Sequence, residues 1–434
     1  MAKILIETYG CTLNQADSEM MERILAQAGH TVKTGRYDPN DQYDYVIMNT
    51  CTVKNPTEQR ILDRLETMKG LGGTLIVTGC MASANPDKIL SRSPGSSIVT
   101  TSNVHRIAEA ISEASFERRI AYEGYSRTDK LSYYSPGSSA IAKIAISEGC
   151  LSNCSFCETK FARGPLNSFS EELILKAIEA SVKKGAREIE LTSQDAGAYG
   201  LDRKTNIAEL ALKAVGIDGD FKIRIGMLNP EHLPKYIDEM VEAYKTGKLY
   251  KFIHLPVQSG SDSILKKMGR KYTVDEFMSL ASELKSKVTD ISIATDIIVG
   301  FPGETEEDFT QSLQLVRLLA PSRINVSKFG ARPHARASRL PQLRNEIIKE
   351  RSLRMYRLAR SAEIRFLTNA VGSRRKVLLT ERNGESVLGR DPSYRQVAVH
   401  GSGCGPGESI EALIYGNTSA CLLAHPAFAE ILNK

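Results

Sequence analysis

The stretch EGCLSNCSFCETKFARG, residues 148–164, decides how the rest of the chain is interpreted. It places Cys150, Cys154 and Cys157 at a C-x3-C-x2-C spacing, without a fourth Cys or His among those residues. A structural zinc site closes its tetrahedron with four ligands, so three thiols leave one position open. The thiols could bind zinc, hold an iron–sulfur cluster or have no joint role, and their tight spacing makes the last alternative the weakest.

The bulk composition is that of a globular protein with several domains. The chain has 434 residues, of which 25% are charged and 41% hydrophobic, and this length suggests two to four domains. No apolar run approaches the ~18–20 residues that span a bilayer, and the N-terminal MAKILIETYG begins on a strand-like run without a leader. We therefore expect a cytoplasmic protein without membrane contact, whose eight cysteines are metal or cluster ligands rather than disulfides.

Positive charge is concentrated in one part of the chain. The formal net charge is +6, yet the segment from Arg323 to Lys376 holds 15 Lys and Arg against three Asp and Glu. Such a block is expected to bind a polyanion, because phosphate binding releases counterions. The competing interpretation is a solvated helix face. The excess of arginine over lysine favours phosphate recognition.

The N-terminal part alternates apolar runs with helical stretches. The runs are KILIETYG, DYVIMNT, TLIVTG and the weaker SSIVTT, and the predicted helices cover residues 14–28, 56–68, 86–90 and 104–113. This alternation is typical of a doubly wound α/β domain with a parallel sheet. We predict that domain over residues 1–115, followed by a charged linker over 116–137.

One cysteine follows each of the first three predicted strands. These residues are Cys11, Cys51 and Cys80. The carboxyl ends of parallel strands share one edge of an open sheet, where ligands bind. Three unrelated buried thiols are the alternative. The matched positions favour one joint site.

A second alternating region follows the linker. Its strand candidates are AIAKIAIS, REIELTS, DFKIRIG, YKFIHLPV, DISIATDIIVG and RINVSKFG, and helical stretches at 170–184, 234–245, 273–287 and 304–320 separate most of them. Six β/α units predict a partial (β/α)6 barrel with its chemistry at the carboxyl ends of the strands. Together with a basic helix over 342–370, this domain is predicted to cover residues 138–369.

The last part of the chain, residues 370–434, differs in pattern. Short runs, RRKVLLT, VLGRD, RQVAVHG and SIEALIYG, alternate with glycine-rich turns and precede a final short helix or tail. This spacing predicts a small antiparallel β-barrel.

Four polar or glycine-rich segments close strands of the predicted (β/α)6 barrel and face the same mouth as the cysteine loop. They are LTSQD, RIG, PVQSGSD and TDIIVGFPGETEED. Glycines there allow a ligand to approach the backbone closely, although glycine turns also simply end strands. The candidate ligand contacts are Gln194, Asp195, Arg224, Gln258, Gly300 and Gly303.

Three thiolates on a cubane 4Fe–4S cluster leave one iron without a protein ligand, so a small molecule can chelate it. S-adenosylmethionine (SAM) does so, and one electron then cleaves its sulfonium to a 5′-deoxyadenosyl radical. The C-x3-C-x2-C loop after the first barrel strand resembles the signature of the radical SAM superfamily. The resemblance implies that Cys150, Cys154 and Cys157 hold this cluster and that the mouth residues bind SAM.

The whole chain resembles the radical SAM methylthiotransferases that modify tRNA or a ribosomal protein. YGCTLNQADSE, NTCTVKN and TGCMA look like that family's N-terminal domain, which implies a second 4Fe–4S cluster on Cys11, Cys51 and Cys80. The barrel from about Val371 resembles the RNA-binding TRAM domain. One SAM would methylate a sulfur at the second cluster, and the radical from another SAM would remove hydrogen from the adenine C2 that receives the methylthio group. No catalytic residue is assigned beyond the cluster ligands.

The segments FCETKFARGPLNS and LTSQDAGAYG look most like the archaeal and eukaryotic branch that acts on N6-threonylcarbamoyladenosine beside the tRNA anticodon. One departure is ARPHARASRL, where related chains often carry Pro-Gly-Thr. The alternatives are a ribosomal-protein aspartate or another modified adenosine as substrate, and a metal-stabilised RNA-binding protein without activity. The expected partners are the tRNA anticodon loop and an electron donor such as a ferredoxin or flavodoxin, and the expected state is a monomer.

The predicted RNA contacts lie in the last barrel. They are Arg374, Arg375, Lys376 and Arg395, with Arg382 and Arg390 near its turns. Tyr394 is more often half-buried packing than a base-stacking residue in such a barrel, and His254 is expected to serve packing or support. Cys404 and Cys421 are assigned to neither cluster.

Overall fold

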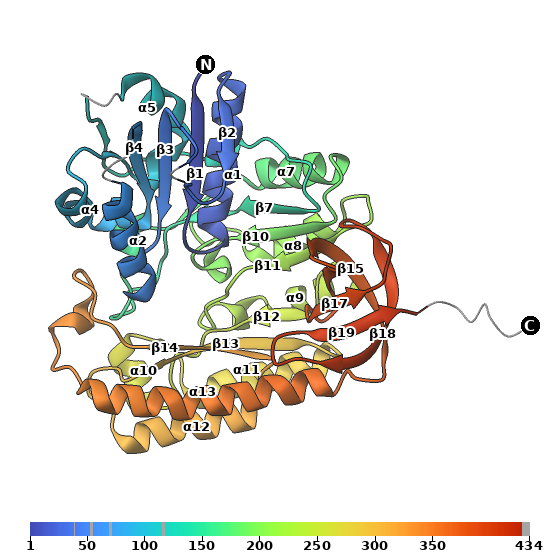
Figure 1. Ribbon diagram of the computed structural model, residues 1–434. Coiled ribbons are helices and arrows are strands. Elements are labelled where there is room, and N and C mark those ends of the chain that lie inside the picture. The colour runs from blue at the N-terminus through green and yellow to red at the C-terminus, as the bar shows by residue number, and fades with distance from the viewer. Residues whose placement is uncertain (39, 53–54, 69–71, 115–117, 428–434) are drawn as a thin grey trace, which may run out of the picture.

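A computed structural model describes residues 1–38, 40–52, 55–68, 72–114 and 118–427 (Figure 1). Its N-terminal region is a six-stranded parallel sheet of order β2-β1-β3-β4-β5-β6. The four runs expected as strands all form, and β2 and β6 are additional. The strands are β1 (Lys3–Thr8), β2 (Thr31–Thr34), β3 (Tyr45–Thr50), β4 (Thr74–Gly79), β5 (Ser97–Val99) and β6 (Ala121–Tyr122).

Helices cover both faces of this sheet, as a doubly wound domain requires. Successive side chains of a strand point to opposite faces, so Leu5 and Val46 enter one buried cluster while Ile4 and Ile47 enter another. The helices are α1 (Thr12–Gln27), α2 (Asn55–Thr67), α3 (Cys80–Ala84), α4 (Pro86–Arg92) and α5 (Ile107–Glu113).

The predicted linker also contributes structure. Its β6 pairs with β5 as an edge strand of the first sheet, and a 3-10 turn, Lys130–Tyr133, buries Lys130. The predicted boundary at 115/116 lies outside the described residues.

Six parallel strands form the central region, which confirms the partial barrel. They make two three-stranded sheets, β11-β10-β7 and β12-β13-β14, which parallel bridges join at Met227–His254 and Ile223–Leu249. The strands are β7 (Ile141–Ala145), β10 (Glu188–Thr192), β11 (Lys222–Ile225), β12 (Phe252–His254), β13 (Ser292–Val299) and β14 (Arg323–Lys328).

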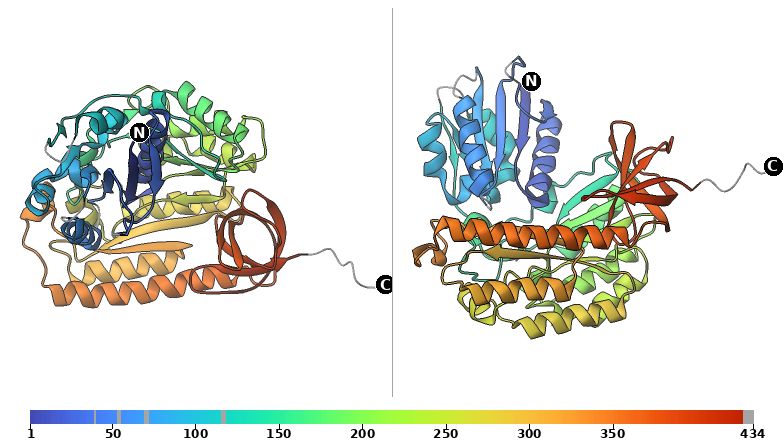
Figure 2. Two further views of the ribbon diagram at one scale, coloured as in Figure 1. Left: turned by 45° about the horizontal axis from the view of Figure 1, so that its top comes forward. Right: turned by 60° about the horizontal axis from the view of Figure 1, so that its bottom comes forward.

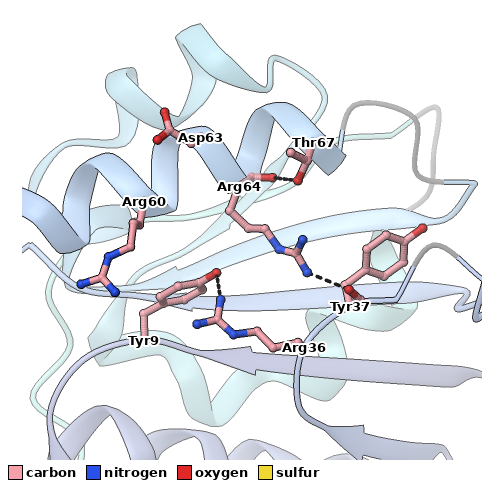
Figure 3. Close-up of a pocket in the computed structure, with 7 residues that line it drawn as sticks. All are labelled: Tyr9, Arg36, Tyr37, Arg60, Asp63, Arg64 and Thr67. Atoms are coloured by element: carbon pink, nitrogen blue, oxygen red, sulfur yellow. Dashed lines mark hydrogen bonds between the residues drawn. The ribbon is translucent and has the colours of Figure 1, made fainter.

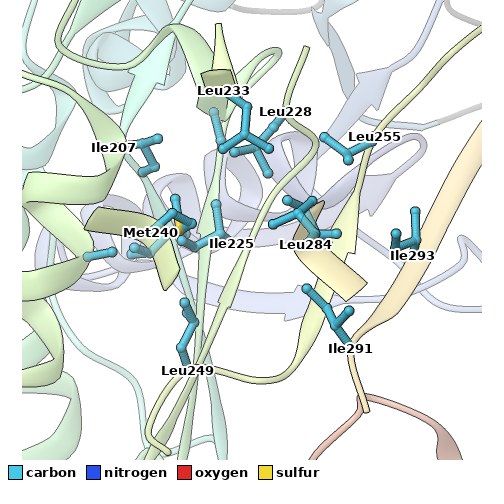
Figure 4. Packing of buried hydrophobic residues seen from close by; sticks show 14 of the residues in the cluster. Ile207, Ile225, Leu228, Leu233, Met240, Leu249, Leu255, Leu284, Ile291 and Ile293 are labelled. Carbon is cyan, nitrogen blue, oxygen red and sulfur yellow. The ribbon is translucent and has the colours of Figure 1, made fainter. Parts of the chain in front are cut away.

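Amphipathic helices pack outside these strands. Figure 4 shows part of the buried cluster between the two layers, with Ile225 of β11, Ile293 of β13 and Leu284 of α11. Two of the helices, α11 and α12, begin with complete capping boxes, at Thr273 and Thr305. The helices are α6 (Thr159–Arg163), α7 (Glu171–Lys183), α8 (Ile207–Val215), α9 (Ile237–Lys245), α10 (Asp262–Met268), α11 (Val274–Lys287), α12 (Glu306–Leu319) and α13 (Asn345–Thr368).

The C-terminal region is a closed barrel of order β15-β16-β17-β19-β18. Four of its strand pairings are antiparallel, as predicted, and the β17–β19 pairing is parallel. β19 lies in the stretch after SIEALIYG for which a short helix or tail was predicted, so that prediction is wrong for these residues; residues 428–434 lie outside the described part. The strands are β15 (Arg374–Asn383), β16 (Ser386–Arg390), β17 (Gln396–His400), β18 (Ser409–Asn417) and β19 (Leu422–Pro426).

Helix α13 connects the mouth of the central barrel with the C-terminal barrel (Figure 2). Near its start, Ile348 packs against Gly300 just beyond β13; near its end, Thr368 hydrogen-bonds Asn417. At 24 residues it is about 36 Å long.

Candidate active site

The C-x3-C-x2-C cysteines form one half-buried loop, here called the loop triad. It lies between the short strand β8 (Ser147–Glu148) and α6. Gly149 starts the loop at φ +76°, and a Cβ there would lie 2.0 Å from the Pro165 carbonyl oxygen, so only glycine fits. The backbone N–H groups of Ser152 and Thr159 donate to the sulfurs of Cys150 and Cys157, each at 3.4 Å.

A half-buried arginine supports the loop triad. Arg270 Nη1 donates to Cys154 Sγ at 3.4 Å, and Nη2 donates to Asn229 Oδ1 at 2.8 Å. Burial, with a smaller contribution from the nearby Asp195 carboxyl, raises the pKa of Cys150 to about 12. Without a metal the Cys150 thiol is therefore protonated at neutral pH, and metal binding must release that proton.

The second set, here called the sheet triad, comprises Cys11, Cys51 and Cys80. These thiols follow β1, β3 and β4, which are neighbours in the sheet. Asn14 Oδ1 accepts from the Cys11 and the Cys80 thiol, both at 3.7 Å. A Cβ on Gly10 would lie 3.0 Å from Cys51 Cβ. The structure thus brings residues that are far apart in sequence to one point.

Burial raises the pKa of Cys80 to about 12; the Arg163 guanidinium opposes this, and the nearby Cys51 and Cys11 thiols add to it. The Asn14 amide nitrogen donates to the carbonyl oxygens of Tyr9 and Thr50, at 3.0 and 2.7 Å. Asn14 therefore ties the thiols to the strand ends that carry them.

Helix α6 and its N-cap residue Glu158 join the two triads into one site. Glu158 accepts from Thr52 Oγ1 at 2.9 Å and from Asn85 Nδ2 at 3.1 Å, both in the N-terminal domain. Thr101 Oγ1 donates to the Ala162 carbonyl at 2.8 Å. Arg163, from the FARG end of the motif, reaches Cys80 Sγ at 3.4 Å. The loop that carries one triad thus packs against the other.

Among the predicted SAM contacts, Asp195 and Gln194 lie where expected, at the carboxyl end of β10. Asp195 accepts from the N–H groups of Gly197 and Asn229, at 3.0 and 2.9 Å, and is buried. Gln194 Oε1 and the neighbouring Ser193 Oγ are buried without a hydrogen-bond partner, so they suit a polar ligand. Gln258 adopts φ +77° and bonds through its backbone to β13.

Three other expected contacts have different surroundings. A Cβ on Gly300 would lie 2.6 Å from Ile348, so that glycine permits the close approach of α13. A Cβ on Gly303 would lie 3.1 Å from Lys267 Nζ. Arg224 lies 5.8 Å from the ring centroids of Phe252 and Tyr394 and lines a cavity of about 400 Å³ between the central and C-terminal barrels.

The predicted RNA contacts are only partly exposed. Arg374 and Lys376 face solvent, whereas Arg375 is half-buried and donates to Ser373 Oγ at 3.0 Å. Arg395 is 9% exposed, lies 2.8 Å from Asp391 and stacks on Phe366. Its position contradicts the expectation that it contacts RNA.

Tyr394 is a packing residue, as favoured from the sequence. At φ +63° it inserts beside Tyr250, and its hydroxyl donates to Glu190 at 3.0 Å. Tyr415 was not predicted as a contact; it is 47% exposed and stacks on His425 on the surface of the C-terminal barrel.

Several arginines of the basic segment, Arg323 to Lys376, form ion pairs within the protein. Arg351 pairs with Glu304 and Glu306, and Arg354 pairs with Glu306 and Glu350. Arg332 pairs with Glu58 of the N-terminal domain. Part of this charge therefore serves domain packing, which weakens the polyanion interpretation of the block as a whole.

A cavity of about 480 Å³ lies at the edge of the first sheet where the sheet triad is found (Figure 3). Two tyrosines and three arginines line it, and Arg36 stacks over Tyr9 at 4.7 Å. The buried Glu7 carboxylate accepts from Arg36 and Arg64. The lining residues are Tyr9, Arg36, Tyr37, Arg60, Asp63, Arg64 and Thr67.

Within the described residues, no three His, Cys, Asp or Glu side chains are grouped so as to hold a metal ion. The donor chemistry nonetheless fits iron–sulfur clusters. Within each triad the thiols lie near enough to influence one another's pKa, and an arginine that donates to one of the sulfurs offsets thiolate charge. Asn14, Arg163, Asn229 and Arg270 were missed by sequence reasoning. Of these four, only Arg163 could have been singled out from the sequence, because it lies inside the EGCLSNCSFCETKFARG motif.

Among the described helices, none combines the length and apolar character that a membrane span requires. Residues 144–316 match the Radical SAM superfamily, and residues 3–101 match the Uncharacterized protein family UPF0004. The fold resembles a solved radical S-adenosylmethionine methyltransferase, TsrM from Kitasatospora setae, with a TM-score of 0.57 at 13% identity, covering 77% of this chain and 75% of that one.

Relatives of known name match most of the chain. A "probable threonylcarbamoyladenosine tRNA methylthiotransferase" of Pyrococcus abyssi is 41% identical, over 87% of this chain and 89% of its own length. The corresponding protein of Archaeoglobus fulgidus is 38% identical, over 95% and 96%. The "threonylcarbamoyladenosine tRNA methylthiotransferase" of Homo sapiens is 32% identical, over 95% of this chain and 72% of its own.

Proposed function

This chain belongs to the threonylcarbamoyladenosine tRNA methylthiotransferase family of radical SAM enzymes, and from that premise we propose how its residues methylthiolate C2 of N6-threonylcarbamoyladenosine at tRNA position 37. Its cofactors are SAM and two 4Fe–4S clusters. The observation that carries the proposal is the joining of two cysteine triads by α6. A reaction that needs two cofactor sites to act on one base requires such a junction.

We propose that the loop triad and the sheet triad each hold one cluster. When bound, SAM and the clusters supply one-electron sulfonium cleavage and a methylthio group for transfer. Gly149 shapes the loop, Arg270 donates to Cys154, and Asn14 fixes the spacing of Cys11 and Cys80. Gln194 presents an unpartnered buried oxygen to SAM, with Asp195 and Gln258 fixing the neighbouring backbone.

The tRNA contacts are proposed at two places. On the C-terminal barrel they are Arg374, Lys376 and the exposed Tyr415, which offers a ring for stacking. At the sheet edge they are the arginines of the cavity in Figure 3. An anticodon-loop base is unpaired or easily unstacked, so it reaches a buried site at modest cost.

The remaining assignments are also proposals. A ferredoxin or flavodoxin supplies electrons, the enzyme acts as a monomer in the cytoplasm, and the C-terminal barrel acts as a TRAM-like RNA-binding domain. Gel filtration of the reconstituted enzyme with light scattering tests the oligomeric state.

The direct test is mass spectrometry of tRNA nucleosides from a host that makes threonylcarbamoyladenosine but lacks its methylthio derivative. Expression of the chain should produce 2-methylthio-N6-threonylcarbamoyladenosine, and the Cys11→Ala form should not. If intact clusters and bound SAM gave no new nucleoside, a ribosomal-protein aspartate would become the first candidate substrate.

A further inference from the structure

Arg163 is a fully buried arginine at the junction of the two triads, with 0% of its side chain exposed. Its Nε donates to Cys80 Sγ at 3.4 Å, and its Nη2 donates to Asn14 Oδ1 at 2.9 Å. Its Nη1 lies 2.9 Å from Glu148 and 2.7 Å from Asp17. One side chain from the loop-triad motif therefore touches a thiol of the sheet triad.

The charges around Arg163 are balanced before any thiol ionises. Lys130 Nζ is buried and lies 3.3 Å from Asp17 and 2.9 Å from Glu148. Two cations thus face two carboxylates. A buried charge is tolerated only with such partners. Lys130 shares these carboxylates with Arg163, whereas the hydrogen bond to the Cys80 sulfur comes from Arg163.

Hydrogen bonds to cysteine sulfur are one of the means by which proteins set iron–sulfur reduction potentials. A cationic donor stabilises the more negative, reduced state more than the oxidised one, and the effect is large where water is excluded. We propose that Arg163 is a positioning residue that raises the reduction potential of the cluster on Cys11, Cys51 and Cys80 through its bond to Cys80 Sγ. The inference rests on the proposed ligand set.

The loop triad repeats this arrangement with a different arginine. Arg270 donates to Cys154 Sγ at the same distance of 3.4 Å, and it too has buried partners, Asn229 and the Pro256 carbonyl. Each triad thus has its own sulfur-bonding arginine. Arg163 differs because it comes from the loop motif and acts on the other triad.

The test uses the full-length chain carrying Cys150→Ala, Cys154→Ala and Cys157→Ala, reconstituted anaerobically so that only the sheet triad is loaded. Redox titration followed by EPR gives its midpoint potential. In this background, Arg163→Gln with Glu148→Gln removes the sulfur donor and keeps the buried charges balanced. Lys130→Gln with Glu148→Gln is the matched control, because it keeps the charges equally balanced and retains the Arg163 donor.

Relative to the parent background, the double variant should shift the reduction equilibrium about tenfold toward the oxidised cluster. Its midpoint potential should therefore be ~59 mV lower for a one-electron couple. The control should lie well above it. An unchanged potential in a fully loaded double variant would overturn the inference. Failure of the parent background to bind about four irons would instead refute the ligand assignment on which it rests.

A second measurement needs no substitution at Arg163. Resonance Raman spectra of the sheet-triad cluster reconstituted in H2O and in D2O should show displaced Fe–S stretching bands, because the N–H donor to sulfur is exchangeable. Identical bands in the two solvents would contradict the proposed bond, even where the double variant fails to fold.

Discussion

The loop triad and the sheet triad reach the same three-thiol arrangement by opposite routes. Cys150, Cys154 and Cys157 lie within one short loop, and the turn at Gly149 orients them locally. Cys11, Cys51 and Cys80 meet only because β1, β3 and β4 are adjacent parallel strands. The loop triad is therefore specified by spacing, whereas the sheet triad is specified by topology and depends on the integrity of a whole domain.

The largest effect should separate the chemical roles of the triads. Cys51→Ala should reduce methylthiolated nucleoside to background while SAM is still cleaved to 5′-deoxyadenosine, because the loop triad stays intact. Cys154→Ala should abolish both products. Chromatography of the two products from one reaction measures both. Equal loss of 5′-deoxyadenosine in the two variants would show that the triads are not independent.

The next effect concerns the connection between the triads. Glu158→Ala removes the acceptor for Thr52 and Asn85 and leaves all six thiols in place. A misplacement of ~1 Å can cost about 100-fold, so methylthiolation should fall ten- to 100-fold while 5′-deoxyadenosine formation stays within about twofold. Lys160→Ala, on the same helix but bonded within the loop to Asn153, is the control and should change the product ratio little.

The same contrast explains what the sequence could predict. Spacing alone identified Cys150, Cys154 and Cys157, and strand alternation placed Cys11, Cys51 and Cys80 at one edge. Arg270 and Asn14 could not be found, because their roles arise from tertiary contacts without a local pattern. The partners that Arg395 and Gly300 meet within the protein could not be predicted for a related reason. The sequence around an arginine or a glycine in a turn does not show whether the residue contacts RNA, a ligand or another part of the protein. In this structure Arg395 contacts Asp391 and Gly300 contacts Ile348.

A stability experiment tests how strongly the sheet triad depends on the folding of the N-terminal domain. Burial opposes ionisation of Glu7, but hydrogen bonds from Tyr9, Arg64 and the Tyr37 backbone outweigh it and lower the pKa below its usual 4.5. Glu7→Gln should therefore cost about 2 kcal/mol at pH 7. When only the sheet triad holds a cluster, the substitution should lower the urea concentration at the midpoint of iron loss by about 1 M. When only the loop triad holds a cluster, this midpoint should stay nearly unchanged.

The pH dependence of this cost has a definite sign. Because the folded pKa of Glu7 is lowered, its stabilisation is complete above the unfolded value and disappears as pH falls through the folded value. The difference between wild type and Glu7→Gln should thus be constant from pH 8 to 6 and shrink below pH 4.5. A difference that grew in acid would contradict the role given to the ionised carboxylate.

The smallest effect should leave both triads untouched. Tyr415→Ala and Arg374→Ala change exposed side chains on the C-terminal barrel, which contributes no thiol to either triad. Each should weaken tRNA binding by about three- to tenfold: a stacking contact is worth ~1–3 kcal/mol, Tyr415 should give the lower end because its ring already stacks on His425, and an exposed phosphate contact is worth less. KM should rise with kcat unchanged, because a remote contact binds the ground state and the transition state equally.

Tyr394→Phe is the buried comparison. It loses its hydrogen bonds to Glu188 and Glu190 and should lower stability without raising KM. A fall in kcat for Tyr415→Ala would mean that the barrel positions the target base between the triads and does more than hold the tRNA.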